Sequence, residues 1–163
     1  MNYLELSKAV SKEEREKLLG PLPIMQCYKK DSSAVLPFKS RFSDVGFDLT
    51  LIKLEKVNGK THYYDTGLVA IPPNGHYFSI EERSSAHKKG IHLRNKRGII
   101  DPEYRGTLIV ALDYDDGVEK LSLPAVVVQL IPHKLILMEM VEVDAISKTT
   151  RNDQGGLGSA QFN

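Results

Sequence analysis

The stretch 95–110, NKRGIIDPEYRGTLIV, combines one acid and one tyrosine with residues typical of a tight turn. Pro102 and Gly106 favour a β-hairpin. An acid at the base of such a hairpin, here Asp101, can activate a water molecule if it stays ionised and faces a pocket. Tyr104 can pack flat on a ring or a sugar. A surface hairpin with a cross-strand tyrosine is the alternative that this stretch alone leaves open.

A second group of residues is suited to binding phosphate. Arg83 offers a planar guanidinium, Ser84 and Ser85 offer hydroxyls, and the residues that follow can begin a helical turn. The backbone N–H groups of such a turn, hydroxyls and a guanidinium together make a phosphate cradle. An ordinary helix cap with a solvated basic face explains the same residues equally well when they are taken alone.

Two polar residues lie in strand-like runs. Asp48 follows a Gly-aromatic pair within 45–51, and its simplest interpretation is a solvated aspartate at the end of a strand. Gln129 interrupts the apolar run 125–131, and a buried amide needs partners either in the protein or in a ligand.

The segment 149–159 combines Arg151 with several glycines. Glycines let backbone amides approach anionic oxygens closely, as they do in nucleotide-binding loops. The segment is not a P-loop, because no Gly-Lys-Ser/Thr follows. A disordered tail is the alternative.

The elements that must position these residues are one helix and a series of short strands. A helix is predicted at 11–19, where Ser11 and Glu14 can form a capping box and Gly20 can end the last turn. Short, closely spaced strands favour a sandwich or barrel over a parallel α/β sheet. The predicted strands are 24–28, 45–51, 66–71, 77–81, 107–114, 125–131 and 135–143.

The chain divides most simply into three parts. We expect an N-terminal helical extension at 1–23, a β-barrel at 24–148 and a flexible C-terminal arm at 149–163. The unalternating apolar run 125–128 predicts a strand that is buried on both faces, against the core and another subunit.

Composition restricts the possible partners. The chain has 163 residues, of which 41% are hydrophobic and 26% charged, as in a folded domain with a sizeable core. Its formal net charge of +1 predicts neither nucleic acid nor an anionic membrane as a partner. A single cysteine, Cys27, and a polar N-terminus favour a cytoplasmic or nuclear protein without a disulfide framework.

Taken in order, the five segments resemble the motifs of the trimeric dUTP pyrophosphatases (dUTPases). The third motif is the most specific, because its Asn, two Gly, Asp and Tyr all stand at the family's spacing. The counterparts are 45–49, Arg83-Ser84-Ser85, 95–106, Val128-Gln129-Leu130, and Arg151 with 155–159.

The resemblance implies a homotrimer of jelly-roll-like β-barrels with active sites shared between subunits, and Mg²⁺-dependent hydrolysis of dUTP to dUMP and pyrophosphate. This activity would limit uracil incorporation into DNA and supply dUMP for thymidylate synthesis. In this family's pattern Asp101 activates the water that attacks the α-phosphorus, and Tyr104 lies under the deoxyribose. Asn95 and the backbone of Gly98, Ile99 and Ile100 would read the uracil edge.

The remaining positions of the resemblance concern phosphate and metal. Asp48 would help to place Mg²⁺ through its waters, and Arg151 would close over the γ-phosphate as the tail folds across the site. The other expected substrate-binding residues are Arg83, Ser84, Ser85, Ile109, Gln129, Leu157, Gly158 and Ser159.

The sequence departs from the family pattern in the fifth and second motifs. Leu157 stands where the family usually has an aromatic that stacks on uracil, and the spacing from Arg151 to Gly156 is one residue longer than usual. The second motif resembles that of the dCTP deaminases, which share this fold. Deaminases, however, use a glutamate where this chain has Ala111 and an arginine where it has Lys88.

Deamination is therefore the alternative enzymatic hypothesis, and without the glutamate it lacks an acid–base group for attack on the cytosine ring. The non-enzymatic hypothesis is a catalytically weak homologue that binds a nucleotide. Retention of Asn95, Asp101 and Arg151 speaks against it.

Overall fold

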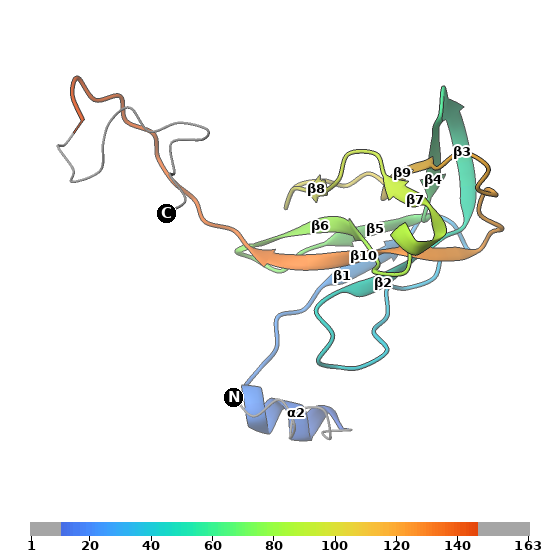
Figure 1. Ribbon diagram of the computed structural model, residues 1–163. Coiled ribbons are helices and arrows are strands. Elements are labelled where there is room, and N and C mark those ends of the chain that lie inside the picture. The colour runs from blue at the N-terminus through green and yellow to red at the C-terminus, as the bar shows by residue number, and fades with distance from the viewer. Residues whose placement is uncertain (1–10, 147–163) are drawn as a thin grey trace, which may run out of the picture.

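The computed structural model describes residues 11–146 of the chain (Figure 1). The predicted arm at 149–163 lies outside the described residues, and with it Arg151, Leu157, Gly158 and Ser159. The described part is a body of strands with a short helix to one side and an extended segment that leaves the body after the last strand. The prediction of an all-β fold is confirmed.

The described residues form ten strands and two short helical segments. The helical segments are α2 (Lys12–Leu19) and the 3-10 turn η1 (His87–Lys89). The strands are β1 (Gln26–Lys29), β2 (Phe47–Leu51), β3 (Lys53–Asn58), β4 (Thr61–Asp65), β5 (Leu68–Ile71), β6 (His76–Glu82), β7 (Ile91–Leu93), β8 (Gly98–Ile100), β9 (Ile109–Tyr114) and β10 (Ala125–Lys134). No helix within this part of the chain is long and apolar enough to cross a membrane.

The strands pair into three antiparallel sheets. Two sheets have four strands, in the orders β2-β10-β6-β8 and β3-β4-β9-β7, and β1 pairs with β5 in a third. In β6 and β10 alternate residues face inwards, so that Phe78 and Ile80 meet Leu130 and Val128 in one core. Inward-facing residues of β2, β4, β5, β7 and β9 complete that core, among them Leu49, Leu51, Tyr64, Leu68, Ala70, Leu93, Val110 and Leu112.

Strand β10 does not show the expected burial on both faces along its length. Val127 and Val128 are both buried, at 2% and 0% exposed, beside a register irregularity in the pairing with β2, but from Val128 to Ile131 buried and half-buried residues alternate. The strand runs three residues further than the predicted 125–131.

The predicted strand at 135–143 is wrong. Residues 135–146 are extended and pair with no strand in the described chain, and their apolar side chains are largely exposed, up to 98% for Met140. Their alternation of apolar and acidic residues is a strand pattern, but a strand also needs a neighbour for its backbone N–H and C=O groups.

The hydrophobic pattern did not predict four of the ten strands, β3, β4, β7 and β8. β7 and β8 have three residues each, too few to show a period, and all six residues of β3 are exposed, so it shows no apolar face. The Asn58-Gly59 turn signal did mark the connection between β3 and β4.

Helix α2 has the predicted capping box. The Ser11 hydroxyl accepts from the backbone N–H of Glu14 at 3.0 Å, and the Glu14 carboxylate accepts from the Ser11 backbone N–H at 2.9 Å. Gly20 ends the helix with φ of 73°, and its N–H donates to the Glu16 carbonyl at 2.8 Å. The local sequence thus fixes both ends of this helix.

Two tyrosine hydroxyls pair inside the core. The Tyr64 and Tyr114 oxygens are 2.5 Å apart, and the Tyr114 oxygen also accepts from the backbone N–H of Leu121 at 3.4 Å. Burial and the hydrogen bond with Tyr114 raise the pKa of Tyr64 well above its ordinary value. This contact joins β4 to β9 and to the segment that leads into β10.

We expect Tyr114→Phe to destabilise the protein more than Tyr64→Phe. Loss of Tyr114 leaves the buried Tyr64 hydroxyl unpaired, a cost of about 1–3 kcal/mol, whereas loss of Tyr64 leaves the Tyr114 hydroxyl with Leu121. Urea unfolding at fixed protein concentration measures both values. Equal losses, or a double Phe variant that costs the full sum of the two, would contradict a shared hydrogen bond.

The same tyrosine pair makes the free energy of unfolding depend on pH. The folded-state pKa of Tyr64 is raised, so its contribution to stability is complete below the unfolded tyrosine value of 10.0 and declines as pH rises above it. Unfolding free energy above pH 10 should therefore fall more steeply in the wild type than in Tyr64→Phe.

Candidate active site

The predicted site residues lie in two separate pockets. One, here called the arginine pocket, has a volume of about 310 Å³ and is lined by Ser40, Asp44, Val45, Gly46, Asp48, Arg83, Ser84 and Gln129. The other, here called the hairpin pocket, has about 240 Å³ and is lined by Ile80, Leu93, Asn95, Gly98, Ile99, Ile100, Asp101, Tyr104, Ile109 and Ala111. A further cavity, an apolar groove of about 550 Å³, is lined by none of the predicted site residues.

The arginine pocket is built where β6 ends and β2 begins. Arg83 follows β6, and its Nε contacts Asp48 Oδ1 at 2.9 Å. Because the Asp48 side chain is only 13% exposed, this pair is well shielded and the guanidinium is held in one direction. Asp48 is thus more than the solvated strand-end aspartate that its sequence position allowed.

Gln129 lies across from Asp48 on β10 and is held on both sides. Its Nε2 donates to the Glu82 carbonyl at 3.1 Å, and its Oε1 faces Gly46 so closely that a Cβ there would overlap it. The glycine before the aromatic residue of this motif is therefore required by a close approach. The half-buried amide has a structural partner and also lines the pocket.

The two serines behave differently. Ser84 is exposed and lines the arginine pocket, whereas Ser85 lines neither pocket. After Arg83 the chain turns, with the Ala86 N–H donating to the Arg83 carbonyl at 2.9 Å, and enters η1. The arrangement of arginine, hydroxyl and amide side chains around one concave surface is suited to an anion.

The hairpin pocket is formed by β8 and the turns at either end of it. β8 pairs with the edge of β6, with Ile99 opposite Ser79. Lys96 at the first turn has a left-handed backbone, with φ of 58°, and the side-chain amide of Asn95 lies beside Gly98. This turn directs an amide and the backbone of β8 at the same cavity.

Tyr104 forms one wall of the hairpin pocket. Its ring lies over Gly106, where any Cβ would overlap the phenol, and its hydroxyl donates to the Thr107 carbonyl at 2.9 Å. The spacing of tyrosine and glycine therefore fixes the ring. With 41% of its surface exposed, the ring remains available to a ligand.

Asp101 lies at the end of β8, exposed to solvent, and is the only acid that lines the hairpin pocket. The Tyr104 N–H donates to the Asp101 carbonyl at 3.1 Å, which closes the turn between them. The acid and the tyrosine thus face one cavity from the two ends of one turn. Ala111 lines the same cavity from β9.

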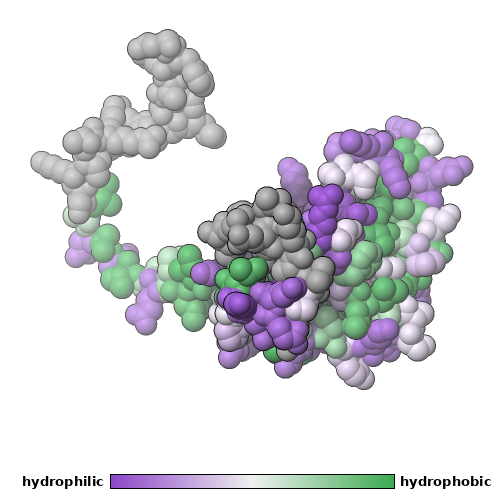
Figure 2. All heavy atoms as spheres, turned by 90° about the horizontal axis from the view of Figure 1, so that it is seen from below, coloured by the Kyte–Doolittle hydropathy of each residue, from purple (hydrophilic) through white to green (hydrophobic). Residues whose placement is uncertain are grey.

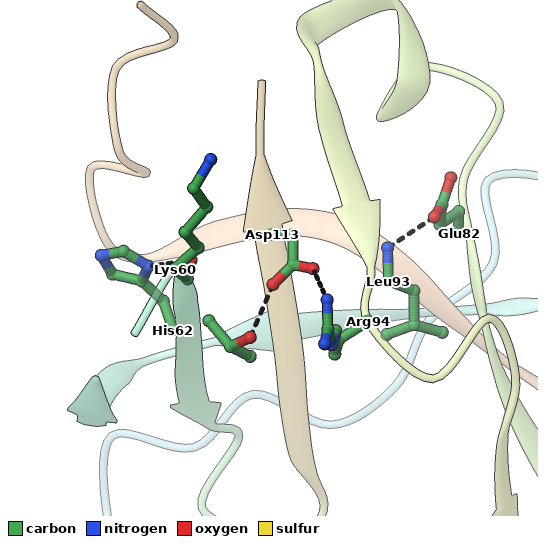
Figure 3. Close-up of polar contacts among 7 residues, drawn as sticks. Lys60, His62, Glu82, Leu93, Arg94 and Asp113 are labelled. Carbon is green, nitrogen blue, oxygen red and sulfur yellow. Dashed lines mark hydrogen bonds and ion pairs between the residues drawn. The ribbon is translucent and has the colours of Figure 1, made fainter. Parts of the chain in front are cut away.

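Residues that the sequence did not identify support the hairpin pocket from behind. The Glu82 carboxylate accepts from the Leu93 N–H, and Glu81 pairs with Arg97 at 3.0 Å. Figure 3 shows the Glu82 contact and, beside it, Asp113 between the hydroxyl of Thr61 and the guanidinium of Arg94.

The contacts of Asp113 keep its carboxylate ionised and hold the side chain of Arg94 in place beside the hairpin pocket. The hydrogen bond from Thr61, together with Arg94, lowers the pKa of Asp113. The Arg94 N–H also donates to the carbonyl of Ala111, at 2.9 Å, so two contacts hold the entrance of the turn against β9. Nothing in local sequence marks Glu82 or Asp113, because their partners come from other strands.

Ser40 and Asp44 are further lining residues that motif spacing did not identify. They belong to the loop before β2, at 38–48, where the Asp44 carboxylate accepts from the backbone N–H of Arg41 at 2.9 Å. An aspartate three residues from its backbone donor is a turn signal, so sequence could have indicated the turn but not its place at the pocket.

The two pockets lie at different points along β6: Ile80 lines the hairpin pocket, and Arg83, just after the strand, lines the arginine pocket. Asp101 follows Ile100, which pairs with Phe78, whereas Arg83 lies five residues further along β6. At about 3.3 Å per strand residue this separation is roughly 16 Å. A single subunit therefore does not bring its candidate water-activating acid to its own anion site.

The family model and the similar proteins point to the same family. The dUTPase family model matches residues 32–160. The deoxyuridine 5'-triphosphate nucleotidohydrolase of Arabidopsis thaliana is 32% identical over 162 residues, which cover 95% of each chain. The protein of the same name from Gloeothece citriformis is 33% identical over 135 residues, covering 80% of this chain and 92% of the relative.

Solved structures share the fold. The Staphylococcus bacteriophage 80alpha dUTPase with dUpNHpp has a TM-score of 0.66 at 18% identity, covering 85% of this chain and 99% of that one. A mutant dUTPase from phage phi11 of S. aureus, a structure that concerns a structural Mg(II) ion, has a TM-score of 0.60 at 17% identity, covering 77% and 99%.

The contact between Gly46 and Gln129 predicts a specific loss in Gly46→Ala. The new Cβ must displace the Gln129 amide and break its hydrogen bond to Glu82, so we expect tripolyphosphate to bind about tenfold more weakly, the value of one hydrogen bond. Isothermal titration measures this affinity.

Gly75→Ala is the matched control. It places a Cβ in open space at φ of 73°, so it strains the backbone by about 1–2 kcal/mol without touching the arginine pocket. Equal weakening of tripolyphosphate binding in both variants would refute the direct contact.

Proposed function

The chain belongs to the dUTPase family, and we propose that it hydrolyses dUTP to dUMP and pyrophosphate. Relatives that cover nearly its whole length are named deoxyuridine 5'-triphosphate nucleotidohydrolases, so it is an enzyme of that type, a dUTP diphosphatase. The observation that carries the reaction is the hairpin pocket, where Asp101 and Tyr104 face one cavity with no second acid in its lining.

In the proposed reaction the hairpin pocket takes the nucleoside. The Asn95 amide and the backbone of Gly98 to Ile100 offer hydrogen bonds to the edge of uracil, and Ile109 adds apolar contact. The Tyr104 ring, which is fixed over Gly106, packs under the deoxyribose.

Asp101 is the proposed general base. It takes a proton from a water whose oxygen attacks the α-phosphorus; the bond from that phosphorus to the bridging oxygen breaks, and pyrophosphate leaves with the electron pair. The products are dUMP and pyrophosphate, which balances one dUTP and one water. Limiting uracil in DNA and supplying dUMP for thymidylate synthesis are the proposed consequences.

The arginine pocket is the proposed phosphate site. Arg83 supplies charge-assisted hydrogen bonds, Ser84 a hydroxyl and Gln129 an amide to the phosphate oxygens. Because Asp48 holds the guanidinium from the protein side, the free edge of Arg83 is directed at the ligand. Roles for Ser85, Arg151, Leu157, Gly158 and Ser159 follow only from the resemblance and remain predictions.

The donor set fits a Mg²⁺ ion that arrives with the substrate. Among residues 11–146 no three His, Cys, Asp or Glu side chains gather to hold an ion, and Asp48 is already paired with Arg83. Mg²⁺ keeps several waters and binds readily through phosphate oxygens, so Asp48 is proposed to contact those waters. When bound, the ion neutralises charge on the phosphate oxygens.

We propose a homotrimer with shared sites. Asp101 and Arg83 of one subunit are roughly 16 Å apart along β6, so we propose that a complete site combines the hairpin pocket of one subunit with the arginine pocket of another. Figure 2 shows hydrophobic side chains along the segment that leaves the body after β10. Exposed apolar residues in this segment are Ile136, Leu137, Met138, Met140, Val141, Val143 and Ile146.

An apolar segment of this kind is typical of a subunit interface. Its burial against a neighbouring copy would give residues 135–146 the contacts that the single chain does not offer them.

We expect Asp101→Asn to lose about 10²- to 10⁴-fold in kcat for dUTP, because an amide cannot accept the proton from water. Pyrophosphate release with Mg²⁺ is measured for dUTP, dCTP, UTP and dTTP, with dUTP strongly preferred. Glu103→Gln, two residues away and outside the pocket lining, is the control and should stay active. Ammonia release from dCTP, or full activity of Asp101→Asn, would overturn the assignment.

Subunit mixing tests the shared site. Asp101→Asn and Arg83→Ala are each expected to be inactive, but co-refolded in equal amounts they should regain about one quarter of wild-type activity, because about one in four sites combines two intact halves. Light scattering should give three times the 18.3 kDa chain mass. A mixture as inactive as its components would exclude sites shared in this way.

A further inference from the structure

Helix α2 lies outside the residues matched by the dUTPase family, 32–160, yet it touches the wall of the arginine pocket. The Arg15 guanidinium sits over the ring of Phe42, 4.4 Å from its centroid. Phe42 belongs to the 38–48 loop, and in Figure 1 the helix lies on the side of the body where this loop leaves β2.

The 38–48 loop is closed at its base and turned at its tip. Phe38 and Asp48 exchange backbone hydrogen bonds of 3.3 and 2.7 Å, which join the two ends. At the tip the Asp44 N–H donates to the Arg41 carbonyl at 3.0 Å, and the Asp44 carboxylate accepts from the Arg41 N–H at 2.9 Å.

One face of the loop is a wall of the arginine pocket. Five of the eight residues that line that pocket come from the loop: Ser40, Asp44, Val45, Gly46 and Asp48. The position of the loop therefore decides the shape of the space that the phosphates enter. Gly46 in particular is packed against Gln129.

The opposite face of the loop lines the apolar groove, where it meets the N-terminal extension. Lys39, Phe42 and Phe47 lie on the loop side of this groove, and Leu22 and Pro23 lie on the side of the extension. The Lys39 ammonium sits 4.3 Å from the centroid of Phe47, and burial lowers its pKa. The loop is thus a thin wall between a polar cavity and an apolar one.

We propose that α2 is a brace for the phosphate site: through Arg15 on Phe42 it holds the 38–48 loop in the conformation that completes the arginine pocket. This inference rests on the proposed function. A loop that is already ordered loses less conformational entropy when a ligand binds, so the brace increases affinity for the triphosphate. It leaves the hairpin pocket, which shares no residue with the loop, unchanged.

The binding experiment uses the full chain and two ligands. Arg15→Ala and Phe42→Leu should each weaken binding of the non-hydrolysable imido analogue of dUTP about three- to tenfold, the value of a cation–π contact. Deoxyuridine, which has no phosphate, should bind each variant like the wild type. The double variant should match the singles, and Arg15→Lys should restore most of the affinity.

Lys56→Ala is the matched control. Lys56 makes a similar contact with the ring of Tyr63, 4.6 Å from its centroid, on the β3–β4 hairpin away from both pockets. It should bind both ligands like the wild type. Unchanged affinity of Arg15→Ala for the imido analogue, or an equal loss for deoxyuridine, would overturn the proposal.

Hydrogen exchange separates this proposal from the proposed function. Without any ligand, Arg15→Ala and Phe42→Leu should speed exchange of the Arg41 and Asp44 amides, whose hydrogen bonds depend on the loop conformation. If the wild-type protein fails to bind the imido analogue, the proposed function is wrong, yet the exchange rates still decide whether α2 orders the loop. Unchanged exchange in both variants refutes the brace.

Discussion

The register of β6 is the constraint on which the site depends. This strand pairs with β10 on one edge and with β8 on the other, and its alternate residues form the centre of the core. Its end carries Arg83 next to Gln129 and Asp48, and its opposite half carries the hairpin with Asp101. Because one strand fixes both groups, their separation is as rigid as the sheet. The proposal of a site shared between subunits therefore rests on the strand rather than on any loop.

The contacts around the two pockets show how few side chains are free to move. Asp48 orients Arg83, Gly46 confines Gln129, and Gly106 confines Tyr104. Glu82 contributes to both pockets, with its carbonyl on Gln129 and its carboxylate on the Leu93 N–H. Such groups bind a ligand at low entropic cost because their rotamers are already selected.

Sequence predicted the fold class and the local turn and cap geometry better than the pairing of the strands. The spacing of Asp101, Tyr104 and Gly106 reflects local turn geometry, and the structure gathers the first two in one pocket. The capping box of α2 is equally local. The division of the site into two halves depends on which strand pairs with β6, and no local pattern encodes that. Residues 135–143 alternate like a strand, but pairing needs a neighbour that the described chain does not supply. Ser40 and Asp44 reach the pocket only through the path of a loop.

The exposed segment 135–146 has a consequence for the life of the protein in a cell. A newly folded single subunit presents a run of aliphatic and thioether side chains, with Leu137 and Met138 each 85% exposed. If the protein assembles as proposed, a subunit that has not yet met its partners resembles a misfolded protein, and chaperones, proteases and aggregation compete for it. Assembly is then a race that depends on synthesis rate, so low expression would reduce the yield of active enzyme more than in proportion to the amount of chain produced.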